Sequence, residues 1–152
     1  MDLHSTYPAI SDLRDRARAR IPRFVWEYLD SATGKEATKL RNRTALNRVG
    51  MMPSVLHGEF QPDLETDFLR VKRPLPFGIA PVGMSGLMWP GAEGHLARAA
   101  ARAELPYTLS TVASQSPEDL QPHLGPDAWF QMYPPRDEGI RIDMLERARA
   151  AG

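Results

Sequence analysis

Polar or turn-forming residues follow three short apolar segments in the second half of the chain, at residues 77–80, 107–109 and 129–132. They are Pro81, Val82 and Gly83 after the first segment, Ser110 and Thr111 after the second, and Gln131 and Tyr133 around the end of the third. A hydroxyl and an amide can meet carbonyl and N–H groups of either polarity, and glycine lets a ligand approach the backbone closely. These residue types therefore suit ligand binding; an ordinary strand-to-helix turn and inward-facing barrel side chains are the alternative interpretations.

The elements that must position these residues alternate between strand and helix. The residues between the first two segments give a helix one apolar face, with the spacing i, i+3, i+4 and i+7 at Leu96, Ala99, Ala100 and Ala103. Glu93 is an early carboxylate of that helix. Strand, turn, helix and strand in units of this size predict parallel strands with covering helices. The sequence therefore predicts an α/β fold whose chemistry collects at the carboxyl ends of the strands.

Composition excludes several classes of function. The 152 residues contain 19 Lys and Arg and 19 Asp and Glu, so the clustered basic excess of a nucleic-acid-binding protein is not expected. Without cysteine there is no disulfide or thiolate metal site, and no metal site is predicted. No apolar run approaches the roughly 18 residues that a membrane helix needs, and the N-terminus does not resemble a signal peptide. We therefore expect a cytoplasmic protein.

Three strings in this part of the chain carry a family resemblance. They read IAPVGMSGLMWP, TLSTVAS and WFQMY, and together they resemble the FMN-dependent 2-hydroxy-acid dehydrogenases and oxidases, which include L-lactate and mandelate dehydrogenases and glycolate oxidase. The resemblance covers about residues 7–152. It implies a (β/α)8 TIM barrel, FMN as cofactor and a small L-2-hydroxy acid as substrate, which is oxidised to the 2-oxo acid.

A closed barrel of this kind takes about 250 residues. We expect about three of its strands here, so the chain is interpreted as the N-terminal part of a longer enzyme. Residues 1–75 should form N-terminal helices, one capped by Ser11 and one opened by Pro22, and a barrel-bottom segment with a small hairpin or edge segment within Thr66–Val71. Residues 76–152 should form the first βα units of the barrel, incomplete at the C-terminus.

The resemblance also assigns roles to the residues at the strand ends. The backbone of Pro81, Val82 and Gly83 would line the reactive edge of the flavin ring. Ser110 and Gln131 would form hydrogen bonds with its pyrimidine edge. These five residues are therefore the predicted cofactor-binding set.

Two tyrosines are the predicted substrate-binding residues. Tyr28 lies in a P-x-x-V-x-x-Y segment and matches the family tyrosine that hydrogen-bonds the substrate carboxylate. From the residues alone, an aromatic core position was the favoured interpretation of Tyr28. Tyr133 matches the tyrosine that contacts the substrate hydroxyl region and stabilises the transition state, so it is also the predicted catalytic residue.

The catalytic histidine of the family would lie further along its barrel. The chain has four histidines, none in a segment that matches the catalytic motif: His4, His57, His95 and His123. We therefore expect this chain to be inactive alone, and a homo-oligomer and any membrane association would belong to the complete enzyme. A non-catalytic remnant that serves as a flavin-binding or interaction module is the alternative. An unrelated α/β phosphate-binding domain is a third interpretation.

Overall fold

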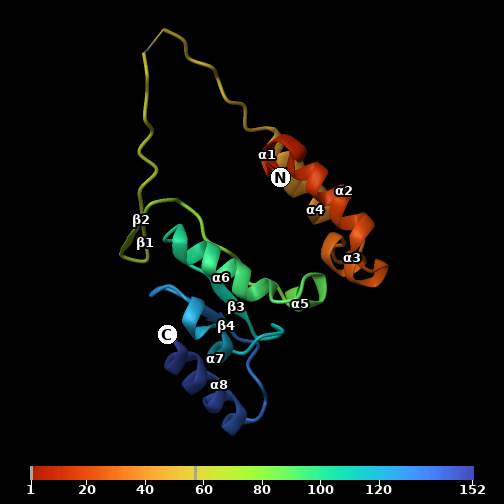
Figure 1. Cartoon of the computed structure of the whole chain (residues 1–152), viewed down its shortest axis with the longest axis vertical. Helices are drawn as coiled ribbons and strands as arrows, with labels where there is room; N and C mark the ends of the chain where they lie inside the picture. The colour runs from red at the N-terminus through yellow and green to blue at the C-terminus, as the bar shows by residue number, and fades with distance from the viewer. Residues whose placement is uncertain (1, 57) are drawn as a thin grey trace. The chain divides into compact units, whose positions relative to one another are not determined.

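The computed structural model describes residues 2–56 and 58–152, with the side chains of residues 3 and 4 excepted. The chain forms two compact units, Met1–Gln61 and Pro62–Gly152, which are described one at a time. Figure 1 shows that the first unit is helical and that the strands belong to the second. The mixture of helices and parallel strands confirms the predicted α/β class.

The first unit contains α1 (Leu3–Thr6), α2 (Ile10–Arg20), α3 (Arg23–Asp30) and α4 (Ala37–Asn47). Helix α3 begins directly after Pro22, as predicted. The expectation that Ser11 caps α2 was wrong, because the carboxylate of Asp12 accepts the Ala9 N–H at 2.9 Å and the helix begins at Ile10. The Arg14 guanidinium donates to both carboxylate oxygens of Asp30, at 3.0 and 2.8 Å, and so joins α2 to α3.

The second unit begins with the predicted hairpin. Strands β1 (Thr66–Phe68) and β2 (Val71–Arg73) are antiparallel and are joined through Leu69 and Arg70, which have φ values of 50° and 67°. Two successive left-handed residues match the right-handed twist of the strands that they connect. The prediction of a hairpin is confirmed, and it extends two residues beyond the expected end.

The parallel sheet follows chain order. Strand β3 (Thr108–Ser110) pairs in parallel with β4 (Trp129–Gln131), and Ile79 forms a parallel bridge with Tyr107 on the other edge of β3. The expected strand over residues 77–80 is therefore reduced to a single bridge. The cause lies in its flanks, since Pro76 and Pro81 have no N–H to donate to a ladder.

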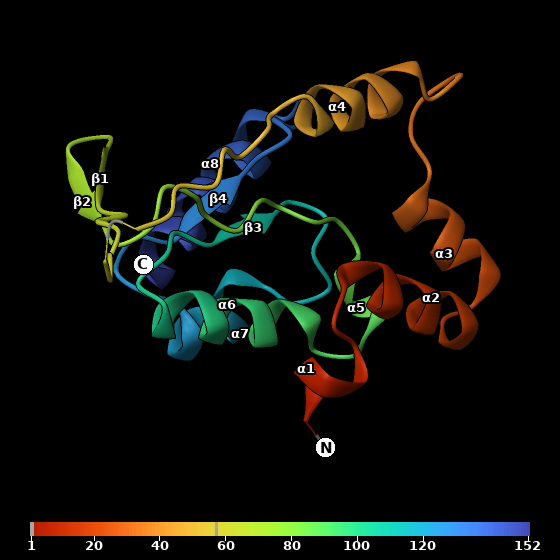
Figure 2. The same cartoon turned by 90° about the horizontal axis from the view of Figure 1, so that it is seen from above.

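The other elements of the second unit are helical. They are α5 (Ser85–Met88), α6 (Ala92–Arg102), α7 (Pro117–Leu120), the 3-10 turn η1 (Gln121–His123) and α8 (Glu138–Ala151). Figure 2 shows α6 and α7 together beside β3. Ala97 and Ala100 are buried and share a core with Tyr107, Leu109 and Leu120.

The apolar face of α6 differs in part from the prediction. Ala103 is exposed, because the helix ends at Arg102 and Ala103 is its C-cap. The buried residues of α6 are Glu93, Gly94, Ala97 and Ala100, of which Glu93, Ala97 and Ala100 recur at i, i+4 and i+7. The predicted face is confirmed at Ala100, which is buried, and at Leu96, which packs against the core. A carboxylate therefore occupies a core position of this helix.

The hairpin lies at the amino-terminal end of the parallel strands. Arg73, at the end of β2, forms an ion pair of 2.5 Å with Asp127, which precedes β4. The rings of Phe68 and Trp129 are stacked with their centroids 5.6 Å apart. The opposite, carboxyl-terminal end of the strands carries the predicted site residues of this unit, which are Pro81, Val82, Gly83, Ser110, Gln131 and Tyr133.

Candidate functional site

Hydrogen bonds join the segments that follow the strands. The N–H of Met84 donates to the carbonyl oxygen of Val112 at 2.8 Å, and this bond links the segment after the first strand to the segment after β3. The N–H of Tyr133 donates to Thr111 Oγ1 at 2.9 Å, which links the segments after β3 and β4. Thr111 Oγ1 in turn donates to the carbonyl oxygen of Gln131. The structure therefore brings the predicted strand ends of this unit together at one edge.

Ser110 and Gln131 form a polar pair at this edge. They are direct neighbours in the parallel ladder, and the Ser110 hydroxyl donates to Gln131 Oε1 at 3.2 Å. Ser110 Oγ also accepts the N–H of Val112 at 3.3 Å. Their neighbours Leu109 and Phe130 pack in the core with residues of α6 and α7, so strand alternation turns Ser110 and Gln131 to the opposite face of the sheet, where Ser110 is 5% exposed.

The donors at this edge suit a ligand with alternating carbonyl and N–H groups. The amide nitrogen of Gln131 has no hydrogen-bond partner among the described residues, although its oxygen is bound by Ser110. A primary amide can offer two N–H donors. Pro81 and Val82 are exposed and Gly83 is half-buried, so this backbone can be approached at the same edge. This donor set fits the pyrimidine edge of a flavin.

The two predicted tyrosines have different surroundings. Tyr133 follows β4, is 65% exposed and is held at its backbone by Thr111. Tyr28 lies on α3 in the first unit and is 49% exposed, so the core position favoured from the residues alone was wrong. Val25 is the buried residue of that helix. An exposed phenol remains available for a ligand.

The sequence predicts Glu93 near the start of a helix but assigns it no role at the site. Its side chain is buried on α6, and Oε1 accepts the N–H of Ser114 at 2.8 Å and the N–H of Gly86 at 3.3 Å. Burial alone would raise the pKa of this carboxyl, but the hydrogen bonds that it accepts outweigh burial and lower the pKa. The signal in the sequence was its i, i+4, i+7 spacing with Ala97 and Ala100.

The histidines are not gathered at this edge. His95 is exposed on α6 with Nδ1 2.9 Å from Nη2 of Arg98, and His123 is half-buried in η1. His57 lies outside the described residues, and the side chain of His4 is not among them. Within residues 2–56 and 58–152, no group of three or more His, Cys, Asp or Glu side chains could hold a metal ion.

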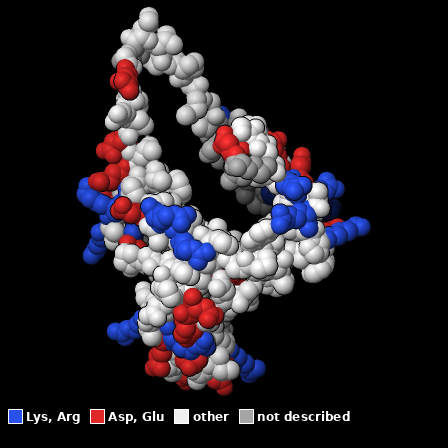
Figure 3. All heavy atoms as spheres, viewed as in Figure 1, with Lys and Arg blue, Asp and Glu red and all other residues white. Residues whose placement is uncertain are grey.

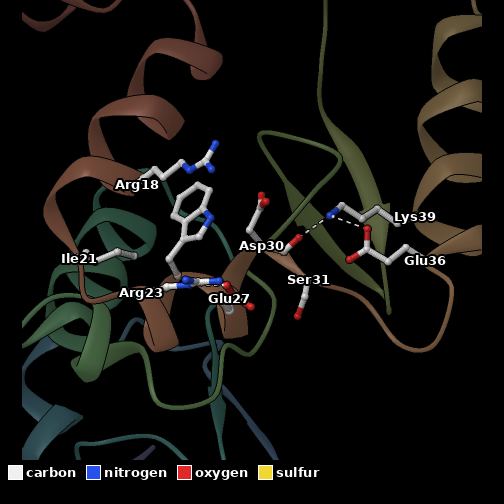
Figure 4. Close-up of a pocket in the computed structure, with 9 residues that line it drawn as sticks. Arg18, Ile21, Arg23, Glu27, Asp30, Ser31, Glu36 and Lys39 are labelled. Atoms are coloured by element: carbon white, nitrogen blue, oxygen red, sulfur yellow. Dashed lines mark hydrogen bonds and ion pairs between the residues drawn. The ribbon is translucent and has the colours of Figure 1, made fainter.

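A separate hollow of 520 Å³ lies in the first unit, between α2, α3 and α4. Figure 4 shows acidic and basic side chains facing one another around it. Arg23 pairs with Glu27 at 3.0 Å, and Lys39 with Glu36 at 3.4 Å. Because its charges are largely paired with each other and it contains none of the predicted site residues, this hollow is not the candidate site.

Charges of both signs are mixed on the surface around α8. In Figure 3, Lys and Arg atoms alternate with Asp and Glu atoms over the region of α8. There Arg147 pairs with Glu118 at 2.6 Å and with Asp143 at 3.7 Å, and Arg141 pairs with Glu138 at 3.5 Å. In the part of the chain that the structure describes, no helix has the length and apolar character needed to cross a membrane.

Comparison with known proteins identifies relatives over nearly the whole sequence. An L-lactate dehydrogenase of Xanthobacter autotrophicus is 39% identical over 142 residues, and a 4-hydroxymandelate oxidase of Amycolatopsis orientalis is 37% identical over 147. These matches cover 93% and 97% of this chain but only 37% and 41% of the relatives. The chain therefore spans about two fifths of the length of the curated relatives that it matches.

Solved structures agree with the sequence relatives. A mandelate oxidase matches 97% of this chain with a TM-score of 0.83 and 37% identity, and the chain covers 43% of it. A soluble mutant of the membrane-associated (S)-mandelate dehydrogenase from Pseudomonas putida matches 94% with a TM-score of 0.83 and 31% identity, and the chain covers 41% of it. The profile of the FMN-dependent dehydrogenases, whose cofactor is FMN, matches residues 17–152. The chain belongs to the FMN-dependent dehydrogenase family.

Proposed function

We propose that this chain forms the first part of a (β/α)8 barrel enzyme that uses FMN to oxidise a small L-2-hydroxy acid to the 2-oxo acid. The joined strand ends carry this proposal, above all the part-buried Ser110–Gln131 pair, whose side chains are hydrogen-bonded at 3.2 Å. The parallel order of Ile79, β3 and β4 follows the chain, as the consecutive strands of such a barrel do. Residues 76–152 would be the first barrel units, and residues 1–75 would precede them.

The cofactor would be held by the polar groups of the strand ends. Gln131 would donate from its free amide nitrogen to a carbonyl of the pyrimidine edge, and the Ser110 hydroxyl would orient that amide. The backbone of Pro81, Val82 and Gly83 would face the reactive edge. FMN, when bound, supplies the oxidant that takes up the two electrons removed from the substrate.

The two tyrosines would orient the substrate. Tyr133, two residues beyond Gln131, would donate a hydrogen bond at the substrate hydroxyl region, where charge develops in the transition state. Tyr28 would donate its phenolic hydrogen to the substrate carboxylate. No histidine of this chain is proposed as the base that accepts the hydroxyl proton, because His95 and His123 belong to helical segments away from the strand ends.

The test is to join this chain at Gly152 to the part of the Xanthobacter L-lactate dehydrogenase that follows the matched region. We expect the joined protein to bind FMN, seen as quenched flavin fluorescence, and to reduce it with L-2-hydroxy acids. The unjoined chain should bind FMN weakly and show no turnover. Failure of the joined, folded protein to bind FMN would refute the proposal, and FMN binding without turnover would favour a flavin-binding module.

The proposed role of Tyr133 is tested in the same joined protein. Tyr133→Phe removes one donor and should slow turnover by about 100-fold while FMN stays bound. The matched control is Tyr107→Phe, which removes a hydroxyl from the buried core and should leave turnover unchanged. Loss of flavin from Tyr133→Phe, instead of slowed turnover, would show that this tyrosine is structural.

A further inference from the structure

Glu93 connects two segments that are distant from each other in the sequence. Gly86, in α5, lies seven residues before it, and Ser114, after β3, lies 21 residues beyond it. Both backbone N–H groups donate to the same carboxylate oxygen, Oε1. The side chain is 1% exposed, so the two hydrogen bonds are shielded from water. Hydrogen bonds to an ionised acceptor are stronger than those between neutral groups.

The two segments held by Glu93 are those that carry proposed cofactor contacts. Gly86 lies one turn after the strand end at Pro81–Gly83, and Ser114 likewise lies one turn after Ser110. The Met84–Val112 hydrogen bond of 2.8 Å joins the same two segments nearer to the strand ends. Two contacts therefore set the distance between these segments at the site: the Met84–Val112 hydrogen bond and the Glu93 carboxylate.

Close packing at the same point leaves the two segments little freedom. A Cβ added to Gly86 would lie 2.4 Å from Ser114 Oγ and 2.5 Å from Ser114 Cβ. On the other side, Gln115 Oε1 accepts the N–H of Gly94 at 3.0 Å and fixes the segment to α6. Glu93 thus lies between the helix and both segments, and it acts on the site through the backbone.

The cost of burying this carboxylate argues against a role in packing alone. A buried charge is unfavourable unless it is hydrogen-bonded, and an apolar side chain of similar size would fill the same space without that cost. The second oxygen, Oε2, has no partner with hydrogen-bond geometry among the described residues, and neither has the buried Ser85 hydroxyl oxygen. That hydroxyl nevertheless contributes to lowering the pKa of the Glu93 carboxyl, less than the N–H of Ser114 does. The site therefore keeps a carboxylate whose clear effect is to hold two N–H groups.

We propose that Glu93 is a positioning residue for the cofactor, which holds the segments after the first strand and after β3 at the separation that the flavin requires. The inference rests on the proposed function, since it takes these segments as the walls of the FMN site. Glu93 itself does not touch the cofactor or the reacting atoms.

The first test uses the chain as it is and needs no flavin. Amide hydrogen exchange is measured by NMR at Gly86 and Ser114, with the amide of Leu109 in β3 as the internal reference. In Glu93→Ala, exchange at Gly86 and Ser114 should be at least tenfold faster, while Leu109 keeps its protection. Glu93→Gln retains an oxygen acceptor without the charge and should be intermediate. Unchanged exchange at both amides in Glu93→Ala would overturn the inference.

The second test measures FMN affinity in the joined protein by fluorescence quenching. Glu93→Ala should raise the Kd of FMN at least tenfold, which corresponds to about 1.4 kcal/mol, and Glu93→Gln should raise it less. Leu120→Ala is the control, since Leu120 is a core residue of α7 and belongs to neither segment. Its folded fraction should bind FMN as the parent does.

The outcomes of the second test separate the inference from the proposed function. A parent protein that does not bind FMN refutes the proposed function. In the other outcome, the parent binds FMN and the folded fraction of Glu93→Ala binds it with the same Kd, although the variant is less stable. That outcome refutes only the positioning role.

Discussion

Gly86→Ala tests the close contact between the two strand-end segments. The added Cβ would lie 2.4 Å from Ser114 Oγ and 2.5 Å from Ser114 Cβ, whereas carbon atoms pack at roughly 3.5–4.0 Å. The Ser114 hydroxyl can rotate away, but its Cβ cannot move without the backbone, and the Ser114 N–H is held by Glu93 at 2.8 Å. The clash must therefore be relieved by a shift of one segment.

The expected magnitude follows from two opposing terms. Overpacking costs about 1–3 kcal/mol, and a clash with an anchored Cβ belongs to the upper half of that range. Alanine in place of glycine restricts the unfolded chain and returns about 0.4–1 kcal/mol, because Gly86 has no left-handed φ. We expect Gly86→Ala to lower the free energy of unfolding by about 1–2.5 kcal/mol.

The assay is urea denaturation followed by circular dichroism, with a double-mutant cycle. Ser114→Gly removes the colliding Cβ, so Gly86→Ala combined with Ser114→Gly should show a favourable coupling of about 1 kcal/mol or more. Gly94→Ala is the matched control within α6, since its Cβ would meet no atom nearer than 3.4 Å, and it should be neutral or slightly stabilising. A Gly86→Ala variant as stable as the parent, without coupling to Ser114, would refute the reasoning.

Two further predictions concern the core. Leu120→Ala should lower the free energy of unfolding by about 2–5 kcal/mol, because Leu120 is fully buried, whereas Leu145→Ala, at a 49% exposed position, should cost much less in the same urea assay. Burial, with a smaller contribution from Glu93, raises the pKa of Tyr107 to about 12 from 10.0. The folded state thus favours the neutral phenol, so this stabilisation is complete below pH 10 and is lost as the pH rises through about 12. Between about pH 10 and 12, the melting temperature of Tyr107→Phe should therefore fall less steeply with pH than that of the parent. Equal slopes would contradict the raised pKa of Tyr107.

Local features were predictable where one stretch of sequence carried the whole signal. The helix after Pro22, the hairpin near Thr66 and the helix over residues 92–102 follow from prolines, alternation and helical spacing. The order of strand and helix along the chain also indicated parallel strands, and β3 and β4 are parallel. The ends of these segments also placed Ser110 and Gln131 at one edge of the predicted sheet.

Tertiary contacts decided the features that depend on distant partners. Residues 77–80 look like a full strand, but only Ile79 bridges to Tyr107, since a strand is completed by ladder partners on its edges. Ala103 fits the helical period yet is exposed, because the α6 helix ends before it. Helical spacing placed Leu96 and Ala100 against the core correctly, but it could not show that Glu93 and Ala97 would be buried beside them.

The sequence by itself determined the family, the α/β class and the residues that end the strands, because these depend on residue type and on spacing along a short stretch of chain. The tertiary structure alone decided the role of Glu93. Its hydrogen-bond donors belong to segments before and after its own helix, and only folding brings the Gly86 and Ser114 N–H groups to one carboxylate oxygen.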